Sequence, residues 1–513
     1  REHPQVAIAL DFLGQTLAKQ GRLLDAEILL REALEISQRR LGPAHSAIAT
    51  RLNNIALVLS DQGREEEAVQ LLRRSLAITE KTLGTEHPEY ATTLSNVALH
   101  LLHAGKKQDA ETMYRKALTV RQRVFGKDHV AVAQNLNGLA HALSSQGRRE
   151  EAMTLMRESL AILQKQRGKD HVEVATGMFS LAHMLLKQDQ YGEAEALLRQ
   201  SLSIRQRQLG VDHPLVARTE EALALTLFAT QHTEEALALF AHSAKIDEKQ
   251  VREAASESRM TQFLNQLRNG GAEDRLYSLA LAGPQDAPTS RQLALTTELL
   301  RKGRAAEAGS VANTLLRRSL SNEGVRRQYD AWIGARQALE GLLFGGMGKL
   351  TAEQYRNRLQ ELRGQVESTE AQLLDDLPAS RKQRLPEFDA MVSTVAQRLP
   401  TSGALVEFVF YVPALPGSVS LSQLKAEPHY LALLLFPDQR SAAVDLGPAD
   451  AVNSQAGELL SKLQNPREDP KSAAQALYTL ILRPLLPHLH GATELFLAPD
   501  HALHMIPFDA LHD

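Results

Sequence analysis

The sequence contains no cysteine in 513 residues. It therefore cannot form a disulfide, offer a thiolate to a metal ion or supply a thiol nucleophile. Aromatic residues make up only 4% of the chain, so leucine and alanine supply most of the apolar surface, which favours close-packed helices. No apolar run approaches the roughly 18 residues of a membrane-spanning helix, and the first residues lack the pattern of a signal peptide. We therefore expect a cytoplasmic protein without a membrane segment.

The chain also lacks an excess of charge of one sign. It has 58 basic and 61 acidic residues and a formal net charge of -3. Because nucleic-acid-binding surfaces are usually marked by a basic excess, nucleic acid is not expected as the main partner. The chain is too long for one hydrophobic core, so two or three structural units are expected.

The sequence does contain a repeat. The spacing from His3 to His45, and again from His45 to His87, is 42 residues. Histidine, glycine and alanine each form a column: His3, His45, His87, His129, His171 and His213; Gly42, Gly84, Gly126, Gly168 and Gly210; and Ala26, Ala68, Ala110, Ala152, Ala194 and Ala236. A period of roughly 20 to 50 residues indicates a solenoid, in which each repeat stacks on its neighbours. The period places the preceding glycine one position before Arg1, so we expect the chain to begin inside a longer protein.

Each repeat is expected to form two antiparallel helices. In the second repeat, Leu52, Ile55 and Leu59 have helical spacing up to a break at Gln62-Gly63-Arg64, after which the spacing resumes until Gly84. The small residues of the alanine column at Ala26 and of a second column at Ala56 let paired helices approach to the short end of the roughly 8 to 10 Å range. Equivalent histidines of stacked repeats lie at least one such spacing apart, whereas zinc ligands lie about 2 Å from the metal. We therefore expect the histidines to have a structural role at the turns, and no metal.

The segment from Ala49 to Gly84 contains L-N-N-I-A, Q-G-R-x-x-E-A and A-I-x-x-x-x-L-G. It resembles the 42-residue tetratricopeptide repeats of kinesin light chains and related bacterial proteins. The resemblance covers about residues 1–250 and implies an α-solenoid of six units. The last units depart from the pattern, since Asp189 and Gln231 replace the glycine in the middle of the unit.

The first helix of the second repeat carries the candidate binding residues. Thr50 and Asn54 are expected to point away from the apolar stripe, and Asn53 to lie on its flank. In the resembling kinesin light chains, the second asparagine of this motif helps to hold an extended peptide in the concave groove, and this role carries over only to Asn54 and Asn96. Elsewhere the same column holds Phe12, Gly138, Ser180 and Ala222. The resemblance implies a protein or peptide partner, and a solvated polar face remains the alternative.

Residues 251–395 keep the helical spacing of apolar residues but lose the 42-residue period. We expect a helical connector, with a long amphipathic helix from Thr351 to Leu374 whose Thr351 and Gln354 have the spacing of a capping box. The segment from Leu343 to Lys349 is rich in glycine but lacks the first glycine and the final Ser or Thr of a phosphate-binding loop. No nucleotide or other cofactor is therefore expected.

Residues 396–513 differ in character from the helical part. Strands are expected where β-branched or apolar residues run between turn residues, and helices where the spacing is helical. The expected strands are at 404–411, 430–436, 441–446 and 494–498, and the expected helices at 449–463 and 473–486. Strands that alternate with helices indicate an α/β unit.

This last part resembles the first half of the CHAT family, a group of caspase- and separase-like peptidase domains that commonly follow tetratricopeptide arrays. The matching segments are Arg398-Leu-Pro-x-x-x-Ala404-Leu-Val-Glu, Val444-Asp-Leu-Gly-Pro448, the helix from Leu477 to Leu486, Leu497-Ala-Pro-Asp500 and Ile506-Pro-Phe-Asp-Ala-Leu511. The family usually has glycine where His501 stands, which calls the geometry of that turn into question. Together, the two resemblances imply a mainly α fold: a tetratricopeptide solenoid, a helical connector and a partial α/β caspase-like unit.

The CHAT resemblance implies a mechanism in which a cysteine thiolate, activated by a histidine, attacks a peptide carbonyl. In the family both residues lie downstream of the Pro-Phe-x-Ala-Leu element, so we expect the chain to end inside the domain and to contain no catalytic residue. A metal site formed by His501, His504 and His512 with Asp500 and Asp509 is not expected. On a strand, His501 and His504 would face opposite sides, so these histidines are interpreted as ordinary turn and strand-edge residues.

The sequence supports two functional hypotheses. In the first, the chain is the partner-sensing and scaffold region of a CHAT-type caspase-like cysteine protease, and the repeat array binds a protein or peptide that regulates it. The full-length protein would then be a cysteine endopeptidase. In the alternative, the chain is a non-catalytic tetratricopeptide interaction adaptor.

Overall fold

A computed structural model describes residues 3–19, 23–255, 273–282, 289–303, 323–345, part of 354–369, 386–413, and 427–511 apart from 466 and 490. Two compact units make up the chain. The first comprises Arg1–Met184 with Val311–Arg381, and the second Leu185–Ser310 with Lys382–Asp513. Of the features expected from the sequence, the glycines at 346 and 348 and His512 lie outside the described residues. Throughout these ranges, every helix is too short or too polar to span a bilayer.

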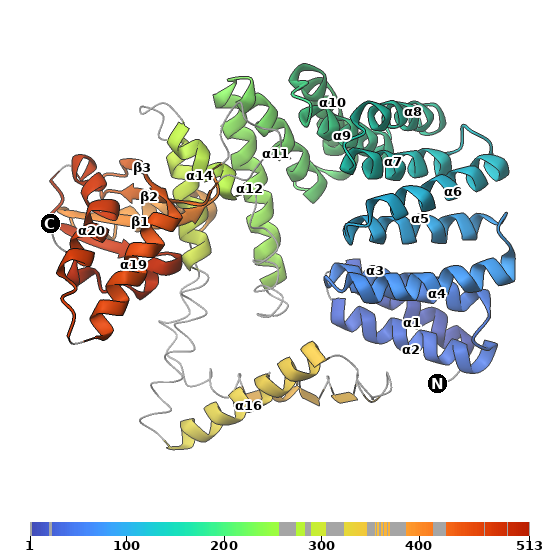
Figure 1. Cartoon of the computed structure of the whole chain (residues 1–513), viewed down its shortest axis with the longest axis horizontal. Helices are drawn as coiled ribbons and strands as arrows, with labels where there is room; N and C mark the ends of the chain where they lie inside the picture. The colour runs from blue at the N-terminus through green and yellow to red at the C-terminus, as the bar shows by residue number, and fades with distance from the viewer. Residues whose placement is uncertain are drawn as a thin grey trace. The chain divides into compact units, whose positions relative to one another are not determined.

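The first half of the chain consists of paired helices, as the 42-residue period predicts (Figure 1). The break at Gln62-Gly63-Arg64 separates α3 from α4, and α12 continues beyond the length of the other second helices. The helices are α1 (Pro4–Lys19), α2 (Leu23–Leu41), α3 (Ser46–Asp61), α4 (Glu65–Leu83), α5 (Pro88–His103), α6 (Lys107–Phe125), α7 (Val130–Ser145), α8 (Arg149–Arg167), α9 (Val172–Leu186), α10 (Tyr191–Leu209), α11 (Pro214–Ala229) and α12 (Thr233–Ala255).

The six repeated histidines cap the first helix of each repeat. In every case the ring Nδ1 accepts a hydrogen bond from the backbone N–H two residues later, at 3.3 Å for His3 and 3.1 Å for His129, with similar values in the other repeats. The first N–H groups of a helix have no partner within the helix, and such a side chain satisfies one of them. The expected structural role at the turns is confirmed.

The two glycine columns differ in backbone conformation. Gly84, between repeats, has φ 81° and ψ 167°, a region that is essentially restricted to glycine. Gly63, in the middle of the unit, also has a positive φ, but Asp189 and Gln231 adopt the same left-handed φ in later repeats, at 57° and 65°. The mid-unit turn therefore tolerates other residues, whereas the turn between repeats requires glycine wherever this ψ recurs.

The alanine columns lie at the closest contacts between helices. Ala26, Ala68, Ala110, Ala194 and Ala236 are all fully buried, and so are the alanines of the first helices, Ala56, Ala98, Ala140, Ala182 and Ala224. Ser75 on α4 donates a hydrogen bond to the backbone oxygen of Ala49 on α3 at 2.8 Å, which small neighbouring side chains permit. The paired helices therefore pack closely, as expected.

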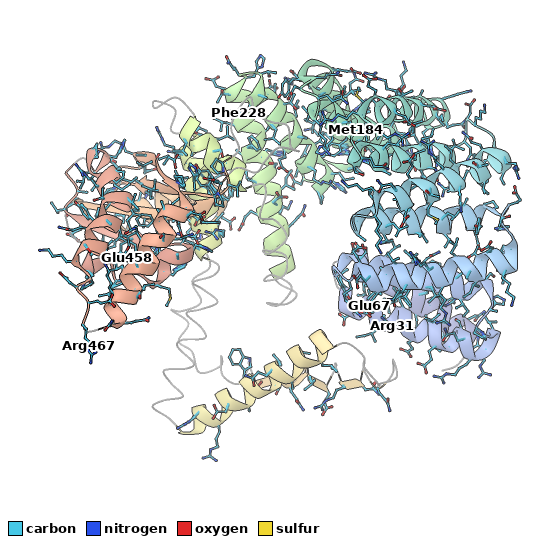
Figure 2. All side chains as sticks on the ribbon, viewed as in Figure 1. Arg31, Glu67, Met184, Phe228, Glu458 and Arg467 are labelled. Atoms are coloured by element: carbon cyan, nitrogen blue, oxygen red, sulfur yellow. The ribbon has the colours of Figure 1, made fainter. Side chains whose placement is uncertain are left out.

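Ion pairs join neighbouring repeats on the second-helix side. Arg64, which precedes α4, binds Glu27 of α2 at 2.9 Å and Glu67 at 2.6 Å. Arg31 also binds Glu27, at 2.8 Å, and Figure 2 labels Arg31 and Glu67 within this group. Such pairs near the surface contribute about 0–1 kcal/mol each, so they tune the stacking that apolar burial provides.

Part of the expected connector packs on the repeats. Leu339 of α16 (Glu323–Gly345) and Leu362 form an apolar cluster with Ile28 of α2. The described positions between 354 and 369 are helical, in agreement with the expected amphipathic helix.

A four-stranded mixed sheet forms the C-terminal part, with strand order β3-β2-β1-β4. The strands are β1 (Gly403–Tyr411), β2 (His429–Leu435), β3 (Ser441–Pro448) and β4 (Glu494–Ala498), close to the expected positions. β2 pairs antiparallel with both β1 and β3, while β1 pairs parallel with β4 so that Glu407 lies opposite Ala498.

Helices cover both faces of this sheet. On one face, Val406, Phe408 and Leu434 pack under α19 (Ala449–Gln464) and α20 (Lys471–Ile481). On the other, Val409 and Leu433 pack under α14 (Glu273–Ala282), the helix at 289–303 and α18 (Met391–Ala396). Burial on both faces explains why β2 is a continuous apolar run.

The helix expected at 473–486 ends earlier, at Ile481, and Arg483–His488 form a 3-10 helix. Pro484 and Pro487 are the reason, because proline cannot donate the backbone hydrogen bond that an α-helix needs.

We predict that Gly84→Ala lowers the unfolding free energy of the array by about 1–3 kcal/mol, since alanine is strained at this φ and ψ. A Cβ at Gly84 would meet no atom within 4 Å, so backbone strain alone is responsible. Gly192→Ala is the matched control, because Gly192 lies within α10, is equally open and lacks a positive φ. It should stabilise by about 0.5–1 kcal/mol. Urea denaturation would measure both, and equal effects would refute the strain argument.

Candidate functional site

The candidate binding residues lie on the first helices of the repeats. These helices also contact one another from repeat to repeat, α1 with α3, α3 with α5 and α5 with α7, and do so more closely than the second helices do. In a curved stack, the elements that approach each other most closely lie on the inner side. The first helices therefore line the inner side of the stack formed by α1 to α8.

Two of the expected asparagines link neighbouring repeats. Asn54 is half-buried, and its side-chain Nδ2 donates to both carboxylate oxygens of Asp11 on α1, at 3.0 and 3.1 Å. Asn53 donates to the hydroxyl of Thr93 on α5 at 3.4 Å, while its own Oδ1 is buried without a partner among the described residues. Both amides are therefore held in a fixed orientation by the repeats on either side.

Thr50 and Asn96 are less constrained. Thr50 is exposed on α3, and Asn96 is half-buried on α5. Within the described part of the chain, the Asn96 amide has no hydrogen-bond partner, so both its donors and its acceptor are available to a ligand.

Exposed apolar side chains accompany these polar groups. Phe12 is 66% exposed in the same repeat column as Asn54 and Asn96, and Leu57 and Leu99, which follow the two asparagines by three residues, are 44% and 36% exposed. Residues three apart are neighbours on a helix surface. We call the surface formed by Phe12, Asn54, Leu57, Asn96 and Leu99 the inner face. The second and third repeats each contribute one amide and one apolar side chain to it, and the first repeat contributes Phe12.

A second arrangement of polar residues lies where the helix at 289–303 meets β1 and β4. Lys302 places its Nζ at 2.8 Å from Glu407 Oε2 and donates to the backbone oxygens of Phe408 and Ala498, also at 2.8 Å. Glu298 is fully buried and accepts from Tyr277. Burial keeps the pKa of Glu407 above its usual range, although the ammonium of Lys302 opposes this shift.

Asp500 completes this charge network. Its Oδ2 accepts from Arg301 and from the backbone N–H of Phe410, each at 3.1 Å, so it ties the end of β4 to β1 and to the helix at 289–303. Arg301 also binds Glu298 at 2.6 Å. Asp500 therefore acts as a structural link in this part of the fold.

The turn at His501 keeps a conformation that suits glycine. His501 has φ 48°, in the left-handed region, and its ring stacks on Phe410 with centroids 4.5 Å apart. The expectation of a strand edge was wrong here, because His501–Met505 form a 3-10 helix. Among the described residues, His501 and His504 belong to no group with metal-ligand geometry.

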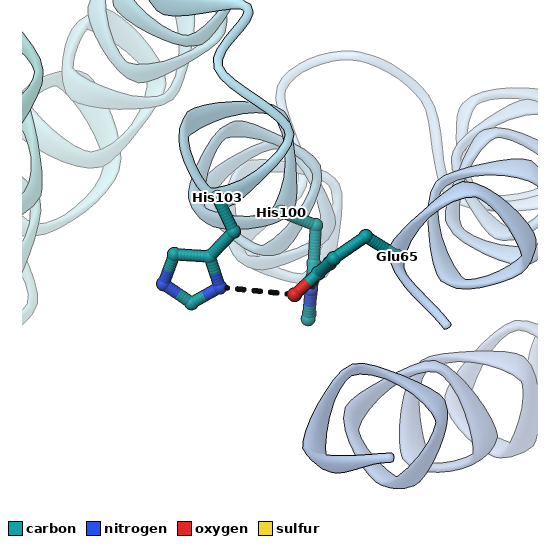
Figure 3. A group of neighbouring side chains, drawn as sticks. All are labelled: Glu65, His100 and His103. Atoms are coloured by element: carbon teal, nitrogen blue, oxygen red, sulfur yellow. Dashed lines mark hydrogen bonds and ion pairs between the residues drawn. The ribbon is translucent and has the colours of Figure 1, made fainter. Parts of the chain in front are cut away.

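One group of side chains is missed by reasoning from the repeat pattern. Glu65, the first residue of α4, meets His100 and His103 of α5 (Figure 3). His100 Nδ1 lies 3.1 Å from Glu65 Oε2, and His103 Nδ1 lies 3.3 Å from Glu65 Oε1. Burial lowers the pKa of His100, although the Glu65 carboxylate acts in the opposite direction. The spacing of three between the histidines is visible in the sequence, but only the packing of α4 on α5 adds the glutamate.

The geometry agrees with the comparisons between this sequence and known families. Residues 5–81, 49–123, 89–165 and 173–249 match the family described as Tetratricopeptide repeat. The N-terminal region is a tetratricopeptide-repeat array. Residues 471–513 match the family described as CHAT domain, and this segment includes β4, Asp500 and the turn at His501. No curated protein sequence matches the chain.

Several solved structures are similar to part of this chain. The putative kinesin light chain repeats of Podosopora anserina are 24% identical, with 41% of this chain and 99% of that one covered and a TM-score of 0.35. BtubC (BKLC) from P. vanneervenii is 20% identical, covering 43% and 87%, with a TM-score of 0.37. The apo form of RapI is 13% identical, covering 48% and 99%, with a TM-score of 0.36.

We predict that Lys302→Ala destabilises the second compact unit by about 3–5 kcal/mol, because removing one member of a buried ion pair leaves an unpaired buried carboxylate. Lys249→Ala, which removes an exposed pair with Asp212 in the same compact unit, is the control and should leave the unfolding midpoint unchanged. Thermal unfolding followed by circular dichroism would compare the two. A midpoint for Lys302→Ala equal to that of the control would contradict the importance of the charge network.

Proposed function

We propose that this chain is the partner-binding and scaffold region of a CHAT-type caspase-like cysteine protease, and that a protein or peptide bound by the tetratricopeptide array regulates the protease. The main support for this proposal is that the second compact unit combines two different parts of the chain. It contains α10 to α12 of the array together with the sheet to which the CHAT-matching segment contributes β4.

The inner face has the chemistry for an extended peptide. Asn54 uses its Nδ2 on Asp11, which leaves its Oδ1 free to accept a backbone N–H, and Asn96 has its whole amide available. Phe12, Leu57 and Leu99 offer apolar area beside these amides. Amides that pair with the peptide backbone, next to apolar contacts for its side chains, are typical of peptide recognition.

Within the second compact unit, the charge network ties the helix at 289–303 to the sheet. Lys302 and Arg301 hold the helix at 289–303 to β1, to the end of β4 and to Asp500. Packed elements with buried charges move as units rather than deform gradually. A change in the position of this helix would therefore displace the carboxyl ends of β1 and β4, where α/β folds usually place their sites.

We predict that Asn96→Ala weakens binding of a peptide selected on the full chain from a displayed random library by about tenfold, which corresponds to one lost hydrogen bond of about 1.4 kcal/mol. Asn54→Ala should weaken it at least as much, because it also removes the link to Asp11. Arg73→Ala, at an exposed position on the second helix α4, is the control and should bind normally. Calorimetric titration would measure all three, and unchanged affinity in both asparagine variants would rule out the inner face as the binding surface.

The alternative is a non-catalytic adaptor, in which partner binding by the array is the whole function. Partner binding is the same in both cases, so proteolysis must discriminate between them. The protease proposal predicts that the full-length natural protein cleaves a substrate protein when its partner is added, and that iodoacetamide abolishes cleavage. Partner binding without any cleavage across a panel of substrate proteins would favour the adaptor.

A further inference from the structure

We propose that Glu65, His100 and His103 form a zinc-binding site that joins the second repeat to the third. This site is independent of the inner face and of the charge network. It lies where the start of α4 meets the end of α5, and its three side chains point toward one another (Figure 3).

The spacing of the ligand atoms fits zinc without rearrangement of the helices. Zinc binds imidazole nitrogen and carboxylate oxygen at about 2.0–2.2 Å in tetrahedral geometry, which places neighbouring ligand atoms about 3.3–3.5 Å apart. The nitrogen-to-oxygen distances are 3.1 Å from His100 to Glu65 Oε2 and 3.3 Å from His103 to Glu65 Oε1, and one ligand atom from each of the three residues lies within 4.8 Å of the others. Only small rotations of the side chains are needed to admit the ion.

The type of ligand selects zinc over the common hard cations. Two imidazoles and one carboxylate suit zinc, whereas magnesium and calcium prefer oxygen ligands throughout. Three protein ligands leave a fourth position for water. His103 is 51% exposed, so both the ion and this water can reach the site from solvent.

The repeat pattern gives independent support, because the three residues coincide at this junction and the architecture alone does not require them. His100 is 2% exposed, and its Nε2 has no hydrogen-bond partner among the described residues. The equivalent position is buried and apolar in three other repeats, at Val58, Ala142 and Met184, and it is threonine in the remaining two, at Thr16 and Thr226, so histidine occurs there once. The nitrogen that faces the cluster is Nδ1, which lies 3.1 Å from Glu65 Oε2. A buried imidazole here, beside a carboxylate and a second imidazole, supplies the ligand types that zinc prefers.

A bound ion would link α4 to α5 at the end opposite their connecting turn. Asn96 lies one helical turn before His100 on α5, so zinc would also fix the helix that carries part of the inner face. The ion would cross-link two repeats that otherwise meet through apolar packing, the hydrogen bonds of Glu65 and the hydrogen bond from Asn53 to Thr93.

The test uses the untagged full chain, stripped with EDTA and then titrated with zinc sulfate. We expect about one zinc ion per chain to remain after gel filtration, measured by inductively coupled plasma mass spectrometry, and a rise in the unfolding temperature on zinc addition. His103→Ala should reduce zinc affinity by at least about 100-fold, since even residues that only support ligands contribute about 10–100-fold. Because His103 is exposed, its substitution should leave the packing of the core intact, and the variant should fold normally.

Two further variants complete the test. Glu65→Gln keeps the size of the side chain but removes its charge, and it should also lose zinc. His504→Ala removes an exposed histidine elsewhere and should retain zinc like the wild type. Failure of the wild type to retain zinc, or equal retention by wild type and His103→Ala, would overturn the proposal. Neither result would bear on peptide binding at the inner face, so the two proposals fail separately.

Discussion

The structure of the array depends on one constraint: a two-helix unit cannot bury its apolar surface alone and must lie close against the next unit. The fully buried alanines allow this close approach, and the turn between repeats sets its direction. At that turn, a glycine with φ 81° and ψ 167° is followed by a histidine whose Nδ1 caps the next helix. Because the same short turn recurs, each unit meets the next at a similar angle, and the first helices come together on the inner side. The candidate binding surface is a consequence of this stacking.

The α/β part depends on a different kind of interaction. Its sheet is apolar on both faces, so helices must cover both, and three of the covering helices come from residues before β1. Apolar packing alone would let these helices slide, since it has little directional preference. The charged side chains of Lys302, Arg301 and Glu298 fix the position of the helix at 289–303 on the sheet, because buried charges require specific partners. The CHAT-matching segment contributes Asp500 to this group, which explains how a segment near the end of the chain is tied to a helix about two hundred residues earlier.

Much of the architecture could be predicted from the sequence, and the differences have physical causes. The helix boundaries follow from the period of the apolar residues. The positions of β2 and its neighbouring strands follow from continuous apolar runs. The helix expected to reach Leu486 stops at Ile481 because prolines follow. His501 adopts a left-handed φ at a position where the family pattern has glycine, and its ring stacks on Phe410. The strand edge expected at His501 was wrong because a single-sequence pattern cannot distinguish a short 3-10 helix from an extended turn.

The sequence by itself determined the period, the two-helix unit, the position of the turns and the change to an α/β fold, because each of these depends on residues near one another in the chain. Only the tertiary structure decided which polar groups meet. Asn54 was placed on the first helix by its spacing, but its bond to Asp11 depends on the stacking of one repeat on another. Glu65 joins His100 and His103, and Lys302 joins Glu407, for the same reason. Side chains far apart in sequence become neighbours through packing distances and angles that the pattern of apolar residues does not encode.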